Sequence, residues 1–588
     1  MELNKEWFEM TAVRRRLLAN AVWIPLRQVE TVTEGGEKHT LGRYEETALA
    51  GAIAFPQHHR ELAERLGWTD LGLPRTEPYA FEDGRYKPAE IYQYDEGEDA
   101  GLHLVLAHNN IADLPTQWLV NQDLVLALGL IQEGKSWVRP SEGYVEVIRQ
   151  RDNPDGSLAA IEIKAEFLRD YLAARGMALR VAVYRQRMAI FRDAAALPDW
   201  RTEPIRESKD HERFETRQFD VAADGGLLGS VAVFHAWRTD VDPDDDVPVM
   251  GPETSENTES THRHYERQGP TLTRVEGEYW REEWIEPADR SERVRGDDPI
   301  DQIQYIVDAA GNRKPGSELD DEDIGRWLWF TPGVIPELLK VRGAKLDWYT
   351  HDTGSVYTSY GYPVHFGVNE IGLVNVYAYD IARLPMWQQR IWASNNVTPN
   401  GALSKELHAS QVLADPASSV APEEAFRGLW LDADALTVRW IGAPLFQKHD
   451  STEAIFASIH RFRALDEPGL LNLAKDIARV TADMIDLAPL RGVVSPPLGQ
   501  TFGSLKQLEK ALATIAAPER ARSALTPLVG IYELRLGDAH LPSSKIQEAF
   551  ALAGVDRTAH PLEQGSQLIE AAVRGMEAVT EIIHERLK

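Results

Sequence analysis

Tryptophan is confined to one part of this 588-residue chain, and this division constrains the fold more than any other feature. All 16 tryptophans lie at or before Trp440. Charge divides the chain at nearly the same place. From Ser451 onward 15 Lys and Arg are balanced by 17 Asp and Glu, so almost all of the net charge of −29 belongs to the first 450 residues. We therefore expect two bodies of different composition, joined near 441–452.

The N-terminal body is expected to mix helices and strands. Residues 44–67 are rich in Ala, Leu and Glu and predict a helix, and residues 160–175 predict another, which ends at Gly176. Short apolar runs that alternate with Gly, Pro, Asp and Asn predict strands at 102–106, 124–128, 179–184 and 229–236.

Polar segments divide this body into three parts. Residues 1–238 are expected to form a mixed α/β domain. Residues 239–325 begin with an acidic, turn-rich stretch and are expected to form an acidic loop and a polar connecting region. Residues 326–445 contain many aromatic residues and strand-like runs, which predict an aromatic-rich domain with β-strands.

The C-terminal body, residues 452–588, is expected to be an all-α bundle, because helical periodicity recurs there with short connections. Thr526-Pro527 has the capping and first-turn signature of a helix start, and Gly554 can end a later helix. The fold class is therefore α+β multidomain. The periodicity predicts helices over 452–465, 467–488, 503–515, 527–540, 543–553 and 560–587.

Composition excludes several classes of protein. The chain has no cysteine, which excludes disulfides, thiolate metal sites and a cysteine nucleophile. Its net charge argues against broad adhesion to nucleic acid or to anionic membranes. No apolar run is long enough for a transmembrane helix, and the N-terminus has no signal-peptide pattern. We expect a cytoplasmic protein without membrane contact.

The segment from Gly129 to Ser136 satisfies the P-loop spacing G-x-x-x-x-G-K-[ST]. A P-loop needs a helix that begins at its Lys-Ser, so that backbone amides surround the phosphates. Pro140 and Gly143 follow instead and oppose a helix. We therefore interpret this segment as a turn between strands, and we expect no nucleotide cofactor.

Two histidine pairs, His58-His59 and His262-Arg263-His264, are weak candidates for metal ligands. Neither pair has a third or fourth ligand at a diagnostic spacing. We expect no metal ion.

An Arg and a His five positions apart, Arg535 and His540, follow the apolar run 528–534 late in the helical body. A neutral imidazole can take the proton of a ribose 2′-OH, and a guanidinium can stabilise charge on the phosphate. Arg206 and His211 have the same spacing, but they lie in a polar segment that we interpret as a coincidence.

With this pair in place, residues 452–588 resemble the HEPN superfamily of helical-bundle ribonucleases and toxins. The signature of that superfamily is an Arg, four to six residues and a His, near the start of a late helix. The resemblance implies a metal-independent endoribonuclease that leaves a 2′,3′-cyclic phosphate, with Arg535 at the phosphate and His540 as general base or acid. It also implies a homodimer, because HEPN sites are usually composite.

The chain departs from the HEPN pattern at the residue after the Arg, where Leu536 replaces a polar residue. Asp538 is a candidate for the missing polar partner, and Glu533 is a candidate for orienting the Arg. Residues five apart on a helix lie about 140° apart. Arg535 and its partner can meet at one phosphate only if the helix ends or bends near Gly537, or if two protomers contribute.

A second resemblance concerns residues 326–415. The segments Phe330-Thr331-Pro332-Gly333-Val334 and Leu384-Pro385-Met386-Trp387 are similar to a region of large uncharacterised bacterial proteins. This resemblance implies bacterial origin and no particular activity.

Together these features predict an RNase effector of bacterial antiviral defence, with a role in abortive infection. Its partners would be RNA, a second copy of the chain and a phage trigger or defence-system protein. The N-terminal body would sense the trigger or regulate the nuclease. The alternative is a non-enzymatic sensor or assembly protein, in which a degenerate bundle serves for dimerisation.

Overall fold

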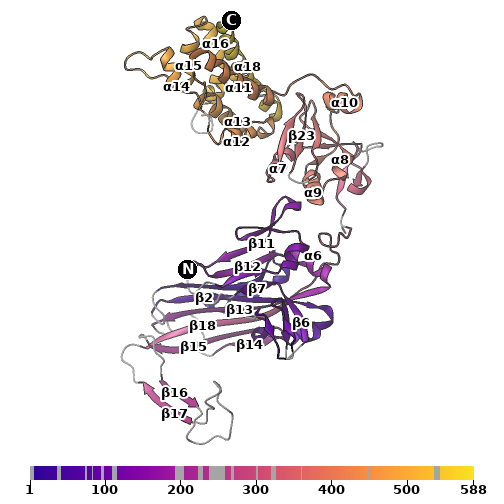
Figure 1. The fold of residues 1–588 in the computed structure, drawn as a ribbon, viewed down its shortest axis with the longest axis vertical. Coiled ribbons are helices and arrows are strands. Elements are labelled where there is room, and N and C mark those ends of the chain that lie inside the picture. Colours follow the sequence, from indigo (N-terminus) through magenta and orange to yellow (C-terminus); the bar gives the residue numbers. More distant parts are fainter. Residues whose placement is uncertain are drawn as a thin grey trace. The chain divides into compact units, whose positions relative to one another are not determined.

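In the computed structural model, the chain folds into two compact units (Figure 1). Unit 1 comprises Met1–Pro140 and Val145–Pro299, and unit 2 comprises Ser141–Tyr144 and Ile300–Lys588. The structure describes residues 5–35, 41–72, 76–82, 84–94, 98–108, 116–192, 204–222, 229–236, 258–265, 271–298, 302–319, 326–358, 361–447, 449–535 and 543–588.

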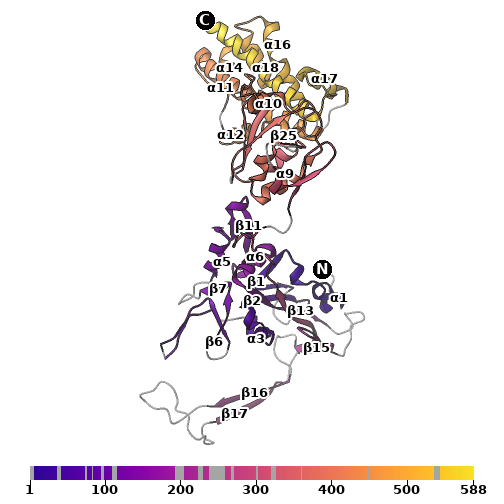
Figure 2. The same ribbon diagram turned by 90° about the vertical axis from the view of Figure 1, so that its right-hand side faces the viewer.

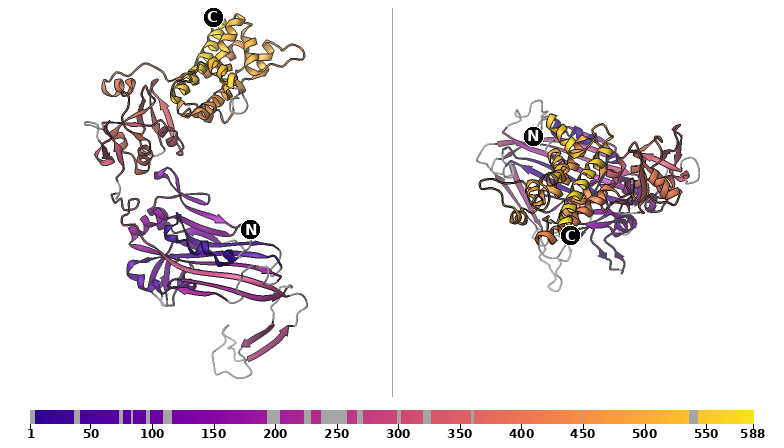
Figure 3. Two further views of the ribbon diagram at one scale, coloured as in Figure 1. Left: turned by 180° about the vertical axis from the view of Figure 1, so that it is seen from behind. Right: turned by 90° about the horizontal axis from the view of Figure 1, so that it is seen from above.

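Unit 1 is built on one large antiparallel sheet, which has twelve strands within the described residues. Its longest strands lie edge to edge, as the view from behind shows (Figure 3). The strands run in the order β14 (Arg206–Lys209), β15 (Glu212–Ala222), β18 (Thr271–Ile285), β13 (Met177–Phe191), β2 (Tyr44–Pro56), β1 (Trp23–Glu34), β12 (Leu158–Lys164), β11 (Val145–Asp152), β10 (Ser136–Arg139) and β9 (Ile131–Glu133), with β6 (Glu98–His103) and β5 (Ile91–Tyr94) branching from β2.

Helix α6 covers one face of this sheet. Its residues Phe167, Leu168 and Leu172 pack with strand residues such as Ile161 and Leu179 in one core. The remaining elements of unit 1 are α1 (Lys5–Glu9), α2 (Thr11–Arg14), α3 (Arg60–Glu64), α4 (Trp68–Leu71), α5 (Gln122–Ala127), α6 (Ala165–Arg175), β3 (Tyr79–Ala80), β4 (Tyr86–Lys87), β7 (Val105–His108), β8 (Gln117–Val120), β16 (Gly229–Ala236) and β17 (Thr258–Tyr265).

The helix expected over 44–67 is wrong over residues 44–56, which form the central strand β2, whereas residues 57–59 form a 3₁₀ turn and residues 60–64 form α3. β2 pairs along its length with β1 and β13. Its Ala50, Ala52 and Ala54 pack into one core while Ile53 and Phe55 pack into another on the opposite face. Both faces are therefore buried, and the strand carries no apolar and polar alternation. Tertiary pairing overrides the helix propensity of alanine here.

The structure of unit 1 differs from the sequence prediction in three other places. The connecting region expected over 239–325 contains the 15-residue strand β18, which pairs with β13 and β15 inside the large sheet. The strand expected at 124–128 is helix α5, which Asn121 caps by accepting a hydrogen bond from the Asp123 amide. The helix expected over 160–175 begins at Ala165, after β12, and ends at Gly176 with φ 63°.

The strands expected at 179–184 and 229–236 are confirmed as part of β13 and as β16. The strand expected at 102–106 is divided between β6 and β7.

Unit 2 begins with a β-rich part. Its core contains Phe330, Phe366 and Trp392, and it also takes in Phe462 and Leu562 from the helical part that follows. The sheet order is β22 (Lys345–Trp348), β23 (Thr353–Tyr357), β24 (Val364–Val368), β25 (Val374–Tyr377), β21 (Trp327–Phe330) and β26 (Asn396–Val397), and the other elements are β19 (Gln304–Ile306), β20 (Arg313–Pro315), α7 (Val334–Leu339), α8 (Ala378–Ala382), α9 (Met386–Ser394) and α10 (Lys405–Val412).

The rest of unit 2 is a helical bundle, so the mixed α+β character expected from the sequence is confirmed. The longest helix, α18 (Pro561–Leu587), lies against α11, α13 and α16 (Figure 1 and Figure 2). The helices are α11 (Pro422–Ile441), α12 (Thr452–Ser458), α13 (Glu467–Ala478), α14 (Leu487–Val493), α15 (Ser504–Leu512), α16 (Pro518–Leu534), α17 (Ser543–Ala553) and α18 (Pro561–Leu587), with a π turn at Arg479–Asp483 and a 3₁₀ turn at Arg461–Arg463.

The bundle starts earlier than the composition indicates, because α11 belongs to it. Trp430 of α11 stacks on Phe446 with ring centroids 4.6 Å apart, and its indole donates to the Val480 carbonyl. The last two tryptophans therefore lie on a bundle helix. The helix start expected at Thr526-Pro527 is also wrong, because α16 begins at Pro518 and contains Pro527.

Candidate functional site

Arg535, the arginine of the expected HEPN motif, directly follows the last residue of α16. Its Nη1 donates to Oδ1 of Asp483 at 2.6 Å and also contacts Oδ2 of that residue. The guanidinium lies 4.8 Å from the ring centroid of Tyr532. The hydrogen bond to the Asp483 carboxylate has the largest effect on the pKa of Arg535. It raises this pKa, so the guanidinium stays a cation.

The other residues of the motif are only partly described. Glu533 is half-buried on α16, and its carboxylate makes no hydrogen bond or ion pair with a described residue. Asp538 and His540 lie outside the described residues. The carboxylate that holds the arginine is Asp483 of the π turn, which lies 52 positions earlier in the chain and which the local motif could not reveal.

The placement of Arg535 agrees with one expectation and differs from another. Because α16 ends at Leu534, it meets one of the two alternatives stated for the pair, a helix that ends near Gly537, and a contribution from two protomers is the other. The HEPN resemblance places the motif near the start of a helix, whereas Arg535 lies at the end of α16 and α17 begins only at Ser543.

The P-loop-like segment is a β-hairpin. Strands β9 and β10 pair, with Ser136 opposite Glu133, and Gly134 takes φ 62° in the turn between them. The ammonium of Lys135 is paired with Asp152. No helix starts at Lys135, so the segment has no amide cradle for phosphates.

The remaining candidates from the sequence are the two histidine pairs and the second Arg-His pair, Arg206 and His211. His59 contacts the Ala100 carbonyl through Nδ1, and its ring stacks edge-on with His58. The side chains of His262 and His264 are outside the described part of the structure. Within that part, no three His, Asp or Glu side chains are placed to hold a metal ion. His211 contacts Arg180, while Arg206 is exposed on β14.

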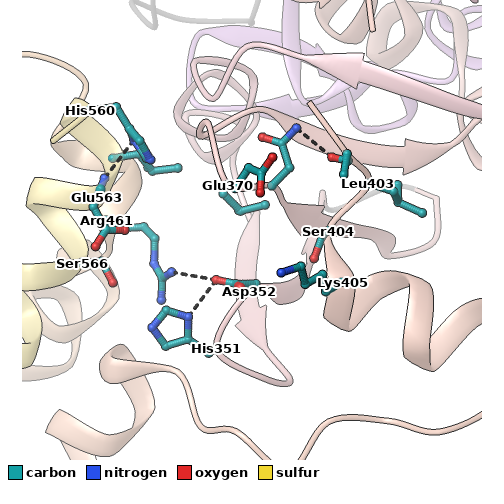
Figure 4. Close-up of a pocket in the computed structure, with 14 residues that line it drawn as sticks. His351, Asp352, Glu370, Leu403, Ser404, Lys405, Arg461, His560, Glu563 and Ser566 are labelled. Carbon is teal, nitrogen blue, oxygen red and sulfur yellow. Dashed lines mark hydrogen bonds and ion pairs between the residues drawn. The ribbon is translucent and has the colours of Figure 1, made fainter. Parts of the chain in front are cut away.

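A polar cleft of about 250 Å³ in unit 2 was not expected from the sequence (Figure 4). It lies between the β-rich part and the start of α18, and we call it the α18 cleft. Its lining residues are His351, Asp352, Val368, Asn369, Glu370, Ala402, Leu403, Ser404, Lys405, Arg461, His560, Leu562, Glu563 and Ser566.

One wall of the α18 cleft carries a buried arginine. Arg461 is 3% exposed, and its Nε and Nη2 donate to the two carboxylate oxygens of Glu423 at 3.0 and 2.9 Å. Its Nη1 lies 3.9 Å from Oδ1 of Asp352, beyond hydrogen-bond distance. Burial acts to raise the pKa of Glu423, but Arg461 more than offsets it, so that pKa is lowered and the pair is ionic. The buried pair fixes the guanidinium before any ligand arrives.

The floor of the cleft holds a charged histidine. His351 contacts Oδ1 of Asp352 through Nδ1 at 2.7 Å and Oε1 of Glu570 through Nε2 at 3.5 Å. These two carboxylates, Asp352 first, raise the pKa of His351 to about 9. The side chain is therefore an imidazolium at neutral pH, and each of its two ring nitrogens already has a carboxylate partner.

Two helices begin at the cleft. Ser404 caps α10 by accepting from the Leu407 amide, and Lys405 is the first residue of that helix. His560 caps α18, since its Nδ1 accepts from the Glu563 amide at 3.2 Å. The positive ends of two helix dipoles therefore adjoin the same cavity.

Glu406 holds the floor in place. One of its carboxylate oxygens accepts from the Asp352 amide at 2.8 Å and from Thr350 at 2.6 Å, and the other accepts from Ser419 at 2.6 Å. Since Ser419 in turn accepts from the His351 amide, the His351-Asp352 dipeptide is fixed from both sides.

Sequence reasoning missed the α18 cleft because its polar residues come from four separate segments. His351, Lys405, Arg461 and His560 share no local motif. The weak signal was the pattern of helix starts at Ser404 and His560, which places two N-termini but does not bring them together.

Comparison with protein-family models, with curated proteins and with solved structures finds no match to this chain. Within the residues that the structure describes, no helix has the length and apolar character that a membrane span requires.

Proposed function

We propose that the helical bundle of unit 2 is a metal-independent endoribonuclease of the HEPN type, in which Arg535 binds the scissile phosphate. The proposal assigns His540 as general base or acid, and Glu533 and Asp538 as supporting groups. It keeps the expected setting: an effector of bacterial antiviral defence that acts as a homodimer, with unit 1 in sensing or regulation.

The observation that carries this proposal is the way Arg535 is held. Both contacts of Arg535 with Asp483 come from Nη1. Its Nε and Nη2 make no hydrogen bond with a described residue, and its side chain is 26% exposed. The guanidinium is thus oriented by one nitrogen and by Tyr532, while two N–H donors remain for a phosphate oxygen pair.

In this proposal, cleavage needs only groups of the chain and the RNA. The general base removes the proton of a ribose 2′-OH, and that oxygen attacks the adjacent phosphorus. The bond from phosphorus to the 5′-oxygen breaks, and this oxygen takes up a proton. Arg535 stabilises the charge that grows on the non-bridging oxygens, and the product is a 2′,3′-cyclic phosphate.

A specific observation also favours the alternative of a non-enzymatic sensor or assembly protein. The Asp483 carboxylate neutralises Arg535 and is an anion beside the proposed phosphate site. An arginine that only ties the end of α16 to the π turn would show the same contact.

The test is cleavage of total RNA and of tRNA by the full-length chain in EDTA. We expect wild type to cleave and to leave cyclic-phosphate ends. Arg535→Ala and His540→Ala should each lower the rate by about 100-fold or more, the usual loss for a group that stabilises transition-state charge. Growth arrest on expression should disappear with the same changes.

The matched control is Arg491→Ala, which removes an exposed arginine of α14 that has no ion-pair partner among the described residues. It should leave cleavage unchanged. If Arg535→Ala cleaves like wild type, the nuclease proposal is wrong. If neither wild type nor variants cleave, but the chain is a dimer in light scattering, the assembly alternative is favoured.

A further inference from the structure

A second cavity, of about 170 Å³, lies in unit 1, and its lining comes mainly from strands β1, β2, β6, β7 and β8. We call it the Arg27 pocket. We propose that it binds a small organic carboxylate, whose carboxylate group pairs with Arg27 while its short carbon chain lies on an apolar wall. The proposal rests on a guanidinium without a carboxylate partner, an imidazole without a hydrogen bond and the cavity that both side chains line. It does not depend on the nuclease proposal.

Arg27, on β1, has an incomplete set of partners. Its Nη1 donates to the Gly72 carbonyl at 3.0 Å, and its guanidinium lies 5.4 Å from the ring centroid of Trp118. Its Nε is enclosed without a partner, and Nη2 makes no hydrogen bond with a described residue. Nε and Nη2 form one edge of the guanidinium, and a carboxylate is the group that pairs with such an edge through both of its oxygens.

The charge of Arg27 is not compensated within the pocket. Burial lowers the pKa of Arg27 to about 10, so the guanidinium is still a cation at neutral pH. The Glu77 carboxylate also lines the pocket, but Glu77 is exposed and makes no ion pair with Arg27. A partly buried cation without a carboxylate partner destabilises the folded chain, and a bound anion would remove that penalty.

His103 supplies a neutral group beside this cation. The side chain is 1% exposed, its Nε2 is enclosed, and neither ring nitrogen makes a hydrogen bond with a described residue. Burial has the largest effect on the pKa of His103, and Lys87 and Arg27 add to it, so this pKa falls to about 4. The ring is therefore neutral at neutral pH, and both of the charges that act on it are positive. Its one N–H can donate to a ligand oxygen.

The rest of the lining determines the kind of carboxylate. Leu26, Ala52, Val105 and Trp118 line the pocket and belong to the core on one face of the large sheet. An apolar wall of this kind suits a carbon chain, and a single cation beside a neutral imidazole suits a monoanion rather than a phosphate dianion. The volume of about 170 Å³ limits the ligand to a few carbon atoms.

The pocket is formed before any ligand binds. A Cβ on Gly51 would lie 2.1 Å from the Leu71 carbonyl oxygen, so only glycine allows the chain before Gly72 to approach β2 this closely. The Thr76 hydroxyl accepts from the Ala107 amide at 2.8 Å and joins the next part of the chain to β7. These contacts fix the carbonyl that holds the guanidinium, which lowers the entropy that binding would lose.

The test is isothermal titration calorimetry of the full-length chain with acetate, butanoate, butanamide and inorganic phosphate. We expect saturable binding of butanoate, weaker binding of acetate and none of butanamide, which has nearly the same shape as butanoate but no charge. Arg27→Gln should weaken the binding of butanoate by about tenfold or more, because it removes the cation. The glutamine amide can still donate to the Gly72 carbonyl, and thermal unfolding without ligand checks that this variant is folded.

The matched control is Arg65→Gln, which makes the same change at an exposed arginine of unit 1, at the end of α3, without an ion-pair partner among the described residues. It should bind butanoate like wild type. The proposal is wrong if neither carboxylate binds to wild type, if butanamide binds as tightly as butanoate, or if phosphate binds in place of the carboxylates. Equal affinity for butanoate in a folded Arg27→Gln would also overturn it. RNA cleavage is not part of this readout, so its failure would bear only on the nuclease proposal.

Discussion

At the scale of single residues, the charged groups around His351 raise its pKa. The imidazolium is held by Asp352 and Glu570, and the Arg461 guanidinium opposes its charge from the 3₁₀ turn. His351 comes from the β-rich part and Glu570 from α18, so protonation of one side chain strengthens a contact between the two parts of unit 2.

This contact predicts a pH dependence of stability. The pKa of His351 is about 9 in the folded chain and lies near 6.5 when unfolded. Its contribution is therefore complete below about pH 6.5 and is lost as the pH rises through 9. Wild type should exceed His351→Gln in unfolding free energy by about 1 kcal/mol at pH 6, after allowance for solvent screening, and the difference should vanish by pH 10.

The measurement is urea unfolding of both chains from pH 6 to 10. The control is His408→Gln, an exposed histidine of α10 without an ion pair to a described residue. It should give a difference that does not vary with pH. A His351→Gln difference that is flat across this range would contradict the assignment of His351 as a cation.

The sequence could predict Arg535 as a candidate, because an Arg and a His at short spacing are visible in one segment. It could not predict Asp483 as its partner or the α18 cleft, since Arg535 and Asp483 are 52 positions apart and Arg461 and Glu423 are 38 positions apart. Such sites depend on how the elements pack, and a local pattern does not contain that information.

At the scale of elements, periodicity predicted α15, α17 and α18 closely, but it did not predict α14 and it placed the start of α16 too late. It failed at β2, where both faces of the element are buried. β2 is rich in alanine and lacks alternation, so its composition indicates a helix. α11 lies before the change in tryptophan content, yet it packs on α18 in the bundle core. In both elements, partners far away in the sequence decide the structure.

The contact of α16 with α17 depends on a glycine. A Cβ on Gly530 would lie 2.3 Å from the amide nitrogen of Ala553, which no flexible side chain can relieve. Gly530→Ala should therefore lower the unfolding free energy by about 1–3 kcal/mol. A Cβ on Gly428 of α11 would have no other atom within 4 Å. Gly428→Ala should therefore raise the unfolding free energy by about 0.5–1 kcal/mol, because alanine favours a helix more than glycine does. Thermal unfolding of both variants tests these two predictions. If both substitutions change the stability in the same direction, this explanation is wrong.

At the scale of the whole molecule, the two units each have their own core. The main core of unit 1 joins the large sheet to α6, whereas the cores of unit 2 join its smaller sheet and its bundle. Composition predicted two bodies, but it placed the division near 441–452 rather than at residue 299. The β-rich part of unit 2 shares aromatic content with unit 1 while it packs against the bundle, which composition cannot reveal.

Separate cores predict separate unfolding transitions in calorimetry. Leu168→Ala, in the core of unit 1, should lower one transition, and Leu528→Ala, in the core of unit 2, should lower the other. Each loss should be about 2–5 kcal/mol, as expected for a leucine truncated in a core. A single transition that both variants shift would instead show that the units unfold as one.

The packing of α11 against α18 has a consequence for synthesis on the ribosome. About 120 residues separate the two helices, and translation at roughly 10 residues per second needs on the order of 10 s to cover them. Throughout that interval the face of α11 that packs on α18 has no α18 to cover it. The nascent chain therefore keeps this face uncovered until α18 leaves the exit tunnel, and the α18 cleft is completed at the same moment.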